Sequence, residues 1–238
     1  MSLPKISYPI FTIELPSSKT KLKFRPMLVK EEKILLMSKA SEDDADIMLA
    51  IKQIVNNCCL EEDFNVEEIT LFDLQYLFIQ LRANSISDVL DLKYIDGEDK
   101  KEYEFQVNLK EIKVIFPEKQ NMTIEINDTT GLIMKYPQAS LYNDKEFVGL
   151  LDENESFLRL VAKSIDTIYD KDQNYSVKDY KESEVVSFVE NLDYKTLEKL
   201  RNFLSNIPYI EHVLKYENTF GTERTITLRT LNDFFMLR

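Results

Sequence analysis

The sequence predicts an α+β fold in which β-hairpins and helices occupy separate stretches of the chain. Several segments alternate apolar and polar residues and are joined by short turns, a pattern typical of paired strands. No helical stretch lies between the strands of a pair, so the sheets are expected to be antiparallel. Other stretches repeat apolar residues every three or four positions, which predicts amphipathic helices. With 238 residues, 44% of them hydrophobic, the chain can bury a sizeable core.

An N-terminal β-hairpin followed by a helical segment is expected first. The stretch FTIELPSSKTKLKFRP alternates on both sides of its PSSKT loop, and Pro26 ends the second strand. A helix is expected from Val29 to about Lys39. Another helix ends near Cys58, whose thiol is expected to pack as a small apolar group.

The third expected helix, LFDLQYLFIQLRA, is apolar on two sides. One stripe consists of Leu71, Leu74, Leu77, Phe78 and Leu81, and the other of Phe72, Tyr76, Ile79 and Ala83. Such a helix is either enclosed between layers of its own fold or covered on one side and offered to a partner on the other. Enclosed helices are common in domains of this size. For the second alternative, we predict that Phe72, Tyr76 and Ile79 contact the partner.

Central antiparallel hairpins are expected between about Val89 and Met134. Alternating runs flank Asp96-Gly97, a dipeptide typical of tight turns, and a second hairpin turns through Asn127 to Gly131. Both hairpins would leave strand edges open for contacts with other proteins.

C-terminal helices with a closing hairpin complete the predicted fold. Helical spacing extends from about residue 140 to residue 207 and includes Ile165 and Ile168. We divide the chain into residues 1–138, with the hairpins and three helices, and residues 139–238, which are mainly helical. One continuous domain is the alternative.

Composition excludes several classes of function. The formal net charge is −12 and the pI about 4.8, which disfavours binding to nucleic acids and anionic membranes. The chain has only four glycines and neither glycine-rich phosphate motif, so a nucleotide cofactor bound in that way is excluded. No apolar run approaches the ~20 residues of a membrane span. The adjacent Cys58 and Cys59 build no disulfide framework and fit a reducing cytosol. We therefore expect a soluble protein without cofactors.

Catalytic and metal-binding residues are not expected either. The chain has one histidine, His212, and no serine-nucleophile motif. The spacing of a calcium loop is matched by Asp170, Asp172, Asn174 and Ser176. That loop type requires a glycine and a closing glutamate where this chain has Tyr175 and Lys181, so a solvated loop is the preferred interpretation. We predict that the protein is not an enzyme.

Three stretches carry a resemblance to a known family: FRPMLVKEEKILLM (Phe24–Met37), AIKQIVNNCC (Ala50–Cys59) and LFDLQYLFIQLRANSIS (Leu71–Ser87). In this order and spacing they resemble the baseplate hub assembly family of T-even-type contractile-tailed bacteriophages. The closing LNDFFM resembles the family more weakly. The resemblance implies a late viral protein that helps to build the central hub of the tail baseplate through contacts with other hub proteins. It would act in the host cytoplasm during assembly, and some members become part of the virion baseplate.

The resemblance also marks a set of scaffold residues: Arg25, Pro26, Glu31, Glu32, Leu81 and Arg82. Arg25 and Pro26 are expected to end the strand, and Glu31 and Glu32 to begin the helix on its solvent side. The apolar residues that follow, Ile34, Leu35 and Leu36, are expected to seat this helix on the core.

Alternatives remain open at two levels. A structural hub subunit would be present in the finished particle at fixed stoichiometry, whereas an assembly factor or chaperone would bind reversibly and be absent from it. The alternative function is a non-viral or host-directed protein-binding module without catalytic activity.

Overall fold

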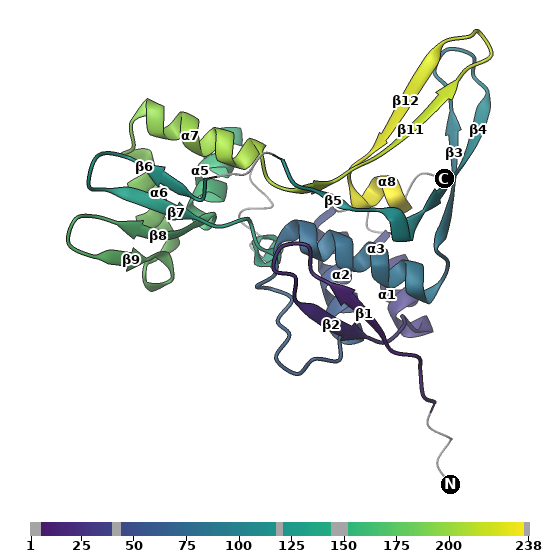
Figure 1. Cartoon of the computed structure of the whole chain (residues 1–238), viewed down its shortest axis with the longest axis horizontal. Coiled ribbons are helices and arrows are strands. Elements are labelled where there is room, and N and C mark those ends of the chain that lie inside the picture. The colour runs from purple at the N-terminus through teal and green to yellow at the C-terminus, as the bar shows by residue number, and fades with distance from the viewer. Residues whose placement is uncertain (1–5, 40–43, 118–120, 144–151, 236–238) are drawn as a thin grey trace. The chain divides into compact units, whose positions relative to one another are not determined.

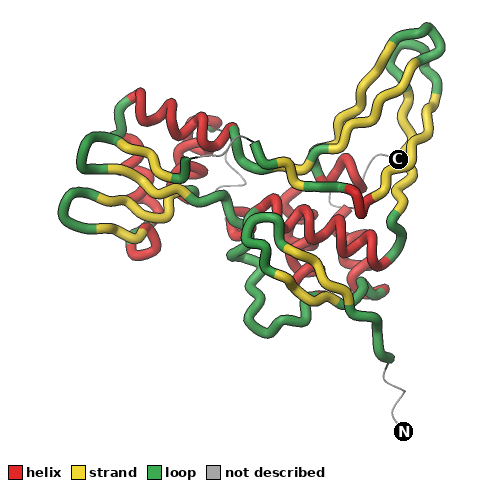
Figure 2. Tube along the Cα trace, in the orientation of Figure 1, coloured by secondary structure: helices red, strands yellow, loops and turns green. Residues whose placement is uncertain are grey.

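The computed structural model describes residues 6–39, 44–117, 121–143 and 152–235 (Figure 1) and confirms the predicted α+β class. Helices and strands follow one another in blocks along the chain (Figure 2), and every strand pairing among the described residues is antiparallel. Within these ranges, no helix has the length and apolar character needed to cross a membrane.

Two compact units make up the chain. Unit 1 combines residues 1–115 with residues 209–238, and unit 2 consists of residues 116–208. This division differs from the one suggested by the sequence, at residue 138. The chain leaves unit 1 after β5 (Val114–Ile115) and returns to it at β10 (Tyr209–Ile210), and these two strands pair. Local patterns do not show such a pairing, because its partners are distant in sequence.

Unit 1 begins with the predicted hairpin and three helices. Their bounds are β1 (Phe11–Glu14), β2 (Lys21–Phe24), α1 (Val29–Lys39), α2 (Asp44–Cys58) and α3 (Leu71–Ser85). The carboxylate of Asp73 on α3, a residue only 1% exposed, accepts hydrogen bonds from the backbone N–H and the hydroxyl of Ser17 in the β1–β2 loop. This contact fixes the hairpin on α3, whose residues Leu74, Leu77 and Phe78 are fully buried.

Two further hairpins of unit 1 lie side by side and extend beyond its helices (Figure 1). They are formed by β3 (Val89–Ile95) with β4 (Glu102–Asn108) and by β11 (His212–Glu217) with β12 (Glu223–Leu228). We call this pair of hairpins the arm. Each hairpin is a separate two-stranded sheet, so side chains rather than ladder hydrogen bonds join one hairpin to the other.

The base of the arm is tied to the helices of unit 1. The 3₁₀ helix η1 (Leu109–Glu111) follows β4, and the side-chain amide of Gln80 on α3 donates to the carbonyl of Leu109 at 2.9 Å. After β12, the short helix α8 (Leu231–Phe235) buries Phe234 completely. The arm therefore starts from the main core of unit 1 at both of its hairpins.

Unit 2 is built on one four-stranded antiparallel sheet with helices packed on it. The strand order is β6 (Thr123–Glu125), β7 (Gly131–Met134), β8 (Ile165–Tyr169) and β9 (Asn174–Ser176). The helices are η2 (Ala139–Asn143), α5 (Glu153–Lys163), η3 (Val177–Asp179), α6 (Glu182–Glu190) and α7 (Tyr194–Ser205). Strands and helices share one core, in which Leu132, Val161, Ile165 and Leu200 are fully buried.

The structure corrects the helix predicted through Ile165 and Ile168, which lie on β8 instead. Helix α5 ends at Lys163 and is capped by Ser164, whose backbone N–H donates back to the carbonyls of Leu160 and Val161. The run IDTIY that follows is rich in β-branched and aromatic residues, which favour strands. Pairing with β7 on one side and β9 on the other decides the conformation, because an apolar spacing of three residues also fits a helix.

Candidate functional site

Aromatic side chains join the two hairpins along the inner face of the arm. Tyr216 of β11 lies among Tyr94 of β3 and Tyr103 and Phe105 of β4, at ring-centroid distances of 6.2, 4.6 and 5.4 Å. Alternation along the strands places these half-buried rings on one face and exposed, mostly charged side chains on the other. Each aromatic pair contributes about 0.5–1.5 kcal/mol beyond its buried area, so this face forms a small core of its own.

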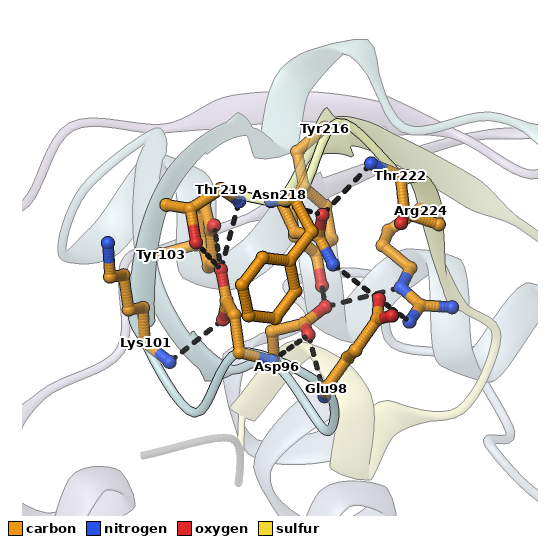
Figure 3. A network of polar contacts seen from close by, with 11 residues as sticks. Asp96, Glu98, Lys101, Tyr103, Tyr216, Asn218, Thr219, Thr222 and Arg224 are labelled. Carbon is orange, nitrogen blue, oxygen red and sulfur yellow. Dashed lines mark hydrogen bonds and ion pairs between the residues drawn. The ribbon is translucent and has the colours of Figure 1, made fainter.

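At the tip of the arm, the loop after β3 accepts hydrogen bonds from the hairpin β11–β12 (Figure 3). The carboxylate of Asp96 accepts from the Tyr216 hydroxyl at 2.6 Å and lies 3.4 Å from Nε of Arg224. Glu98 accepts from the side-chain amide of Asn218 at 2.7 Å and from Nη2 of Arg224 at 2.6 Å. These side chains belong to segments that are distant in sequence, and their contacts lock the two hairpins together.

Asp99 extends the network along the same loop. Its Oδ2 accepts from the backbone N–H of Thr219 at 3.0 Å, from the Thr219 hydroxyl at 2.8 Å and from the Tyr103 hydroxyl at 2.6 Å. Burial alone would raise the pKa of Asp99, but these hydrogen bonds outweigh burial and hold the pKa well below its ordinary value. The hydrogen bond from Tyr216 likewise lowers the pKa of Asp96. Both carboxylates are therefore ionised at neutral pH, the form that accepts these bonds.

The locked tip displays one aromatic side chain, Phe220. Oδ1 of Asn218 accepts from the backbone N–H groups of Phe220 at 3.0 Å and Thr222 at 2.9 Å, and Asn218 is only 4% exposed. Gly221 has a φ of +77°, a conformation that a side chain would strain. The turn is thus held in one geometry, on which Phe220 is 67% exposed. An exposed ring on a rigid turn is a candidate anchor for a protein partner, because little conformational entropy is lost on binding.

Carboxylates outnumber basic side chains in the loops and strand ends of the tip. The acidic residues are Asp96, Glu98, Asp99, Glu102, Glu217 and Glu223, and the basic ones are Lys93, Lys100, Lys101 and Arg224. Glu102 is paired with Lys93 at 2.8 Å, whereas Glu217 and Glu223 are exposed. Arg224 forms ion pairs with Asp96 and Glu98. A partner that complements the tip would therefore combine an apolar pocket with basic groups at its rim.

The predicted partner-contact residues lie elsewhere, on α3. Phe72 is 2% exposed and Ile79 is 0% exposed, so other elements of unit 1 enclose both side chains and leave them no surface for a partner. Tyr76 is half-buried, and burial raises the pKa of its hydroxyl. The prediction of a partner contact is therefore wrong for Phe72 and Ile79. Both side chains are covered by other elements of the same unit, so α3 is enclosed at these positions.

Among the predicted scaffold residues, Arg25 and Glu31 form an ion pair in which Glu31 is buried and Arg25 is half-buried. Nη2 of Arg25 lies 2.9 Å from Oε1 of Glu31, and Nη1 lies 3.2 Å from Oε2. Arg25 also donates to the carbonyls of Pro26 and Asn57, which joins β2, α1 and the end of α2. Glu31 is 0% exposed, and this corrects its predicted solvent-side position, whereas Glu32 is exposed. Burial would raise the pKa of Glu31, but the hydrogen bonds from Arg25 lower it overall.

The remaining predicted residues have more ordinary positions. Leu81 is fully buried and Arg82 is half-buried on α3. On α1, Leu35 is buried as expected, but Leu36 is 60% exposed and does not seat the helix on the core. His212, half-buried, begins β11.

The residues weighed for metal binding or reactivity have structural contacts. Asp170 accepts from the N–H groups of Asp172 and Gln173 and from the Tyr175 hydroxyl, so it caps the β8–β9 turn. Across the described ranges, no group of three or more His, Cys, Asp or Glu side chains could hold a metal ion. Burial raises the pKa of the Cys58 thiol to about 11, which disfavours the reactive thiolate.

The sequence interpretation missed the network at the tip. Both turns were predicted, one at Asp96-Gly97 and one near Gly221, but no local pattern shows that the two hairpins meet. The only signal is the density of polar side chains in IDGEDKK and ENTFGTER, which exceeds what a two-residue turn requires.

A family model matches nearly the whole chain. The family described as "T4 bacteriophage base plate protein" is matched over residues 8–236. No curated protein and no solved structure shows a significant match to the chain. The matched range includes the arm, unit 2 and the three stretches that carried the resemblance. The chain therefore belongs to the T4 bacteriophage base plate protein family, and its role in the phage base plate is structural or in assembly.

Proposed function

We propose that the protein helps to build the central hub of the phage tail baseplate through protein–protein contacts, and that the tip of the arm makes one of these contacts. Family membership supports a base plate role. The resemblance of the three N-terminal stretches favours the hub within the base plate. The proposal involves no catalytic step, and the partners are other hub proteins.

The exposure of Phe220 on the locked tip is the observation that carries the proposal. The network around Asp96 and Asn218 lies in the loops of the arm, and it fixes the position of one exposed ring. Rigid aromatic anchors that fill an apolar pocket dominate the energetics of many protein interfaces. The partner is a hub protein with an apolar pocket for this ring and basic groups at the rim, which match the excess of carboxylates.

The substitution Phe220→Ala tests the role of the arm. Because the ring is 67% exposed, we expect the free energy of unfolding to change by less than about 0.5 kcal/mol. Binding to the hub partner is expected to weaken roughly 30-fold, since a hot-spot residue contributes about 2 kcal/mol or more. The measurements are hub assembly in infected cells supplied only with the variant, and circular dichroism of the purified protein.

Tyr194→Ala is the matched control, because Tyr194 is 69% exposed on α7 of unit 2 and lies outside the arm. Normal hub assembly with Phe220→Ala would contradict the proposed contact. Equal losses with both variants would contradict it as well, because the arm would then have no special role.

An assembly factor and a minor hub subunit differ in whether the protein is present in the finished particle. An assembly factor acts in the host cytoplasm and is absent from finished particles, whereas a minor subunit stays in the virion at a fixed, small copy number. Quantitative mass spectrometry of purified particles beside the infected-cell lysate distinguishes them. Absence of the protein from both base plate intermediates and particles would overturn the hub assignment itself.

A further inference from the structure

A cavity of about 230 Å³ in unit 2 is lined by three lysines, although the chain as a whole is acidic. Lys135 follows β7, Lys163 ends α5, and Lys178 lies on η3. Apolar residues, among them Ala162 and Val185, form part of the wall. The cavity is thus basic but not purely polar.

Only one of the three lysines is neutralised by the carboxylate in the cavity wall. Nζ of Lys163 lies 2.7 Å from Oε2 of Glu182, and the other oxygen of Glu182 lies 3.8 Å from Arg159. Glu182 is therefore already shared between two basic groups. Within the described residues, Lys135 and Lys178 form no side-chain hydrogen bond or ion pair. Among the described residues, no carboxylate therefore lies within ion-pair distance of these two ammonium groups.

Lys135 is half-buried, whereas Lys178 is exposed at the wall of the cavity. The backbone of Lys135 is fixed next to α5, because its N–H donates to the carbonyl of Ser164 at 2.8 Å. Burial lowers the pKa of Lys135 and outweighs the attraction of Asp166, while Lys178 repels the ammonium group. A half-buried ammonium without a partner costs free energy that an anionic guest would recover.

We propose that this cavity binds a carboxylate side chain from an acidic segment of a partner protein. The ammonium groups of Lys135 and Lys178 would hold the carboxylate, and the apolar wall would contact the methylene groups of the guest side chain. This contact with an apolar wall favours a glutamate or aspartate over an inorganic anion. The proposal concerns unit 2 and does not depend on the role of the arm.

Binding of a fluorescently labelled hexaglutamate peptide with blocked termini to the full-length protein tests the proposal. Fluorescence anisotropy is expected to show binding that weakens at least tenfold in Lys135→Met, which keeps most of the aliphatic side chain. Lys178→Met is expected to act in the same direction, and added salt should weaken binding further. Lys171→Met is the matched control, because Lys171 is exposed and does not line the cavity.

A second measurement uses the unsubstituted protein, so that it does not depend on the folding of a variant. Acetylation of individual lysines at pH 8 is followed by mass spectrometry, with and without the peptide. The peptide is expected to protect Lys135 and to leave Lys171 unprotected. Equal binding to Lys135→Met and the unsubstituted protein, absence of protection, or binding of inorganic phosphate without binding of the peptide would each overturn the proposal.

Discussion

Two polar clusters stabilise unit 1 in different ways. Arg25 and Glu31 are close in sequence, and their ion pair is enclosed where β2, α1 and α2 meet. The network at the tip of the arm joins residues such as Asp96 and Tyr216, which are far apart in sequence, and it lies in the loops of two hairpins. The first cluster belongs to the main core, and the second fixes the geometry of a projecting surface.

The Arg25–Glu31 pair is expected to stabilise the whole of unit 1, whereas the tip network is expected to hold only the exposed loops in place. Removal of one partner from an enclosed ion pair leaves a buried charge, which destabilises the whole unit. Removal of a partner at the tip is expected to loosen the loops while the helices remain folded, since local opening follows the local density of contacts. The tip can therefore take part in binding although the folding of unit 1 does not depend on its contacts.

The largest effect is expected for Arg25→Met. Glu31, which is 0% exposed, would lose both hydrogen bonds from the guanidinium group and keep only Lys30 at 3.6 Å and the N–H of Leu28 at 2.9 Å. We expect unit 1 to lose about 3 kcal/mol of unfolding free energy. Chemical denaturation followed by circular dichroism measures this loss. Glu32→Ala, at the exposed neighbouring position, is the control and should change stability by less than about 0.5 kcal/mol. Similar stabilities for the two variants would remove the distinction between the clusters.

A smaller, local effect is expected for Asn218→Ala. Its side chain accepts from the N–H groups of Phe220 and Thr222, so the substitution leaves these two groups without their partner at a cost of about 1–3 kcal/mol, whereas Glu98 keeps its bond from Arg224. Hydrogen exchange should accelerate in the arm loops and stay unchanged in α3. Faster exchange in α3 would show instead that the tip supports the core.

The smallest effect is expected from a change of pH. Protonation of Asp96 and Asp99, or deprotonation of Tyr216, weakens the tip network only outside the neutral range. The pKa values of Asp96 and Asp99 are lowered, so their stabilisation is complete above the ordinary aspartate pKa of about 3.9 and is lost as the pH falls below it. The pKa of Tyr216 is raised, first by burial and then by Asp96, so its contribution is complete below about pH 10 and is lost at higher pH.

Hydrogen exchange of the arm loops as a function of pH, corrected for the intrinsic exchange rate, measures this dependence. We expect constant protection between about pH 4 and pH 10 and a decline on both sides. A change in protection near pH 6 to 7 would contradict this assignment, because the pKa values of Asp96 and Asp99 are lowered and those of Tyr103 and Tyr216 are raised, away from that range.

Local sequence patterns predicted most elements of the fold but not their assembly. The hairpin before Pro26, the helix that begins at Leu71 and the closing hairpin near Gly221 follow from alternation, helical spacing and turn residues. The strand at Ile165 was predicted as a helix, because its apolar spacing fits both structures and pairing with β7 decided between them. The candidate site was missed, although both of its turns were predicted.

The sequence by itself determined the α+β class, the absence of glycine-rich phosphate motifs and the resemblance to a baseplate family, because composition and local spacing carry this information. Only the tertiary structure decided that Phe72 and Ile79 are enclosed, that Glu31 is buried against Arg25, and that the loops of two distant hairpins lock together beneath Phe220. The physical reason is the same in each case. Burial and hydrogen bonding between residues far apart in sequence depend on which surfaces meet, and the pattern along one segment does not specify its neighbour.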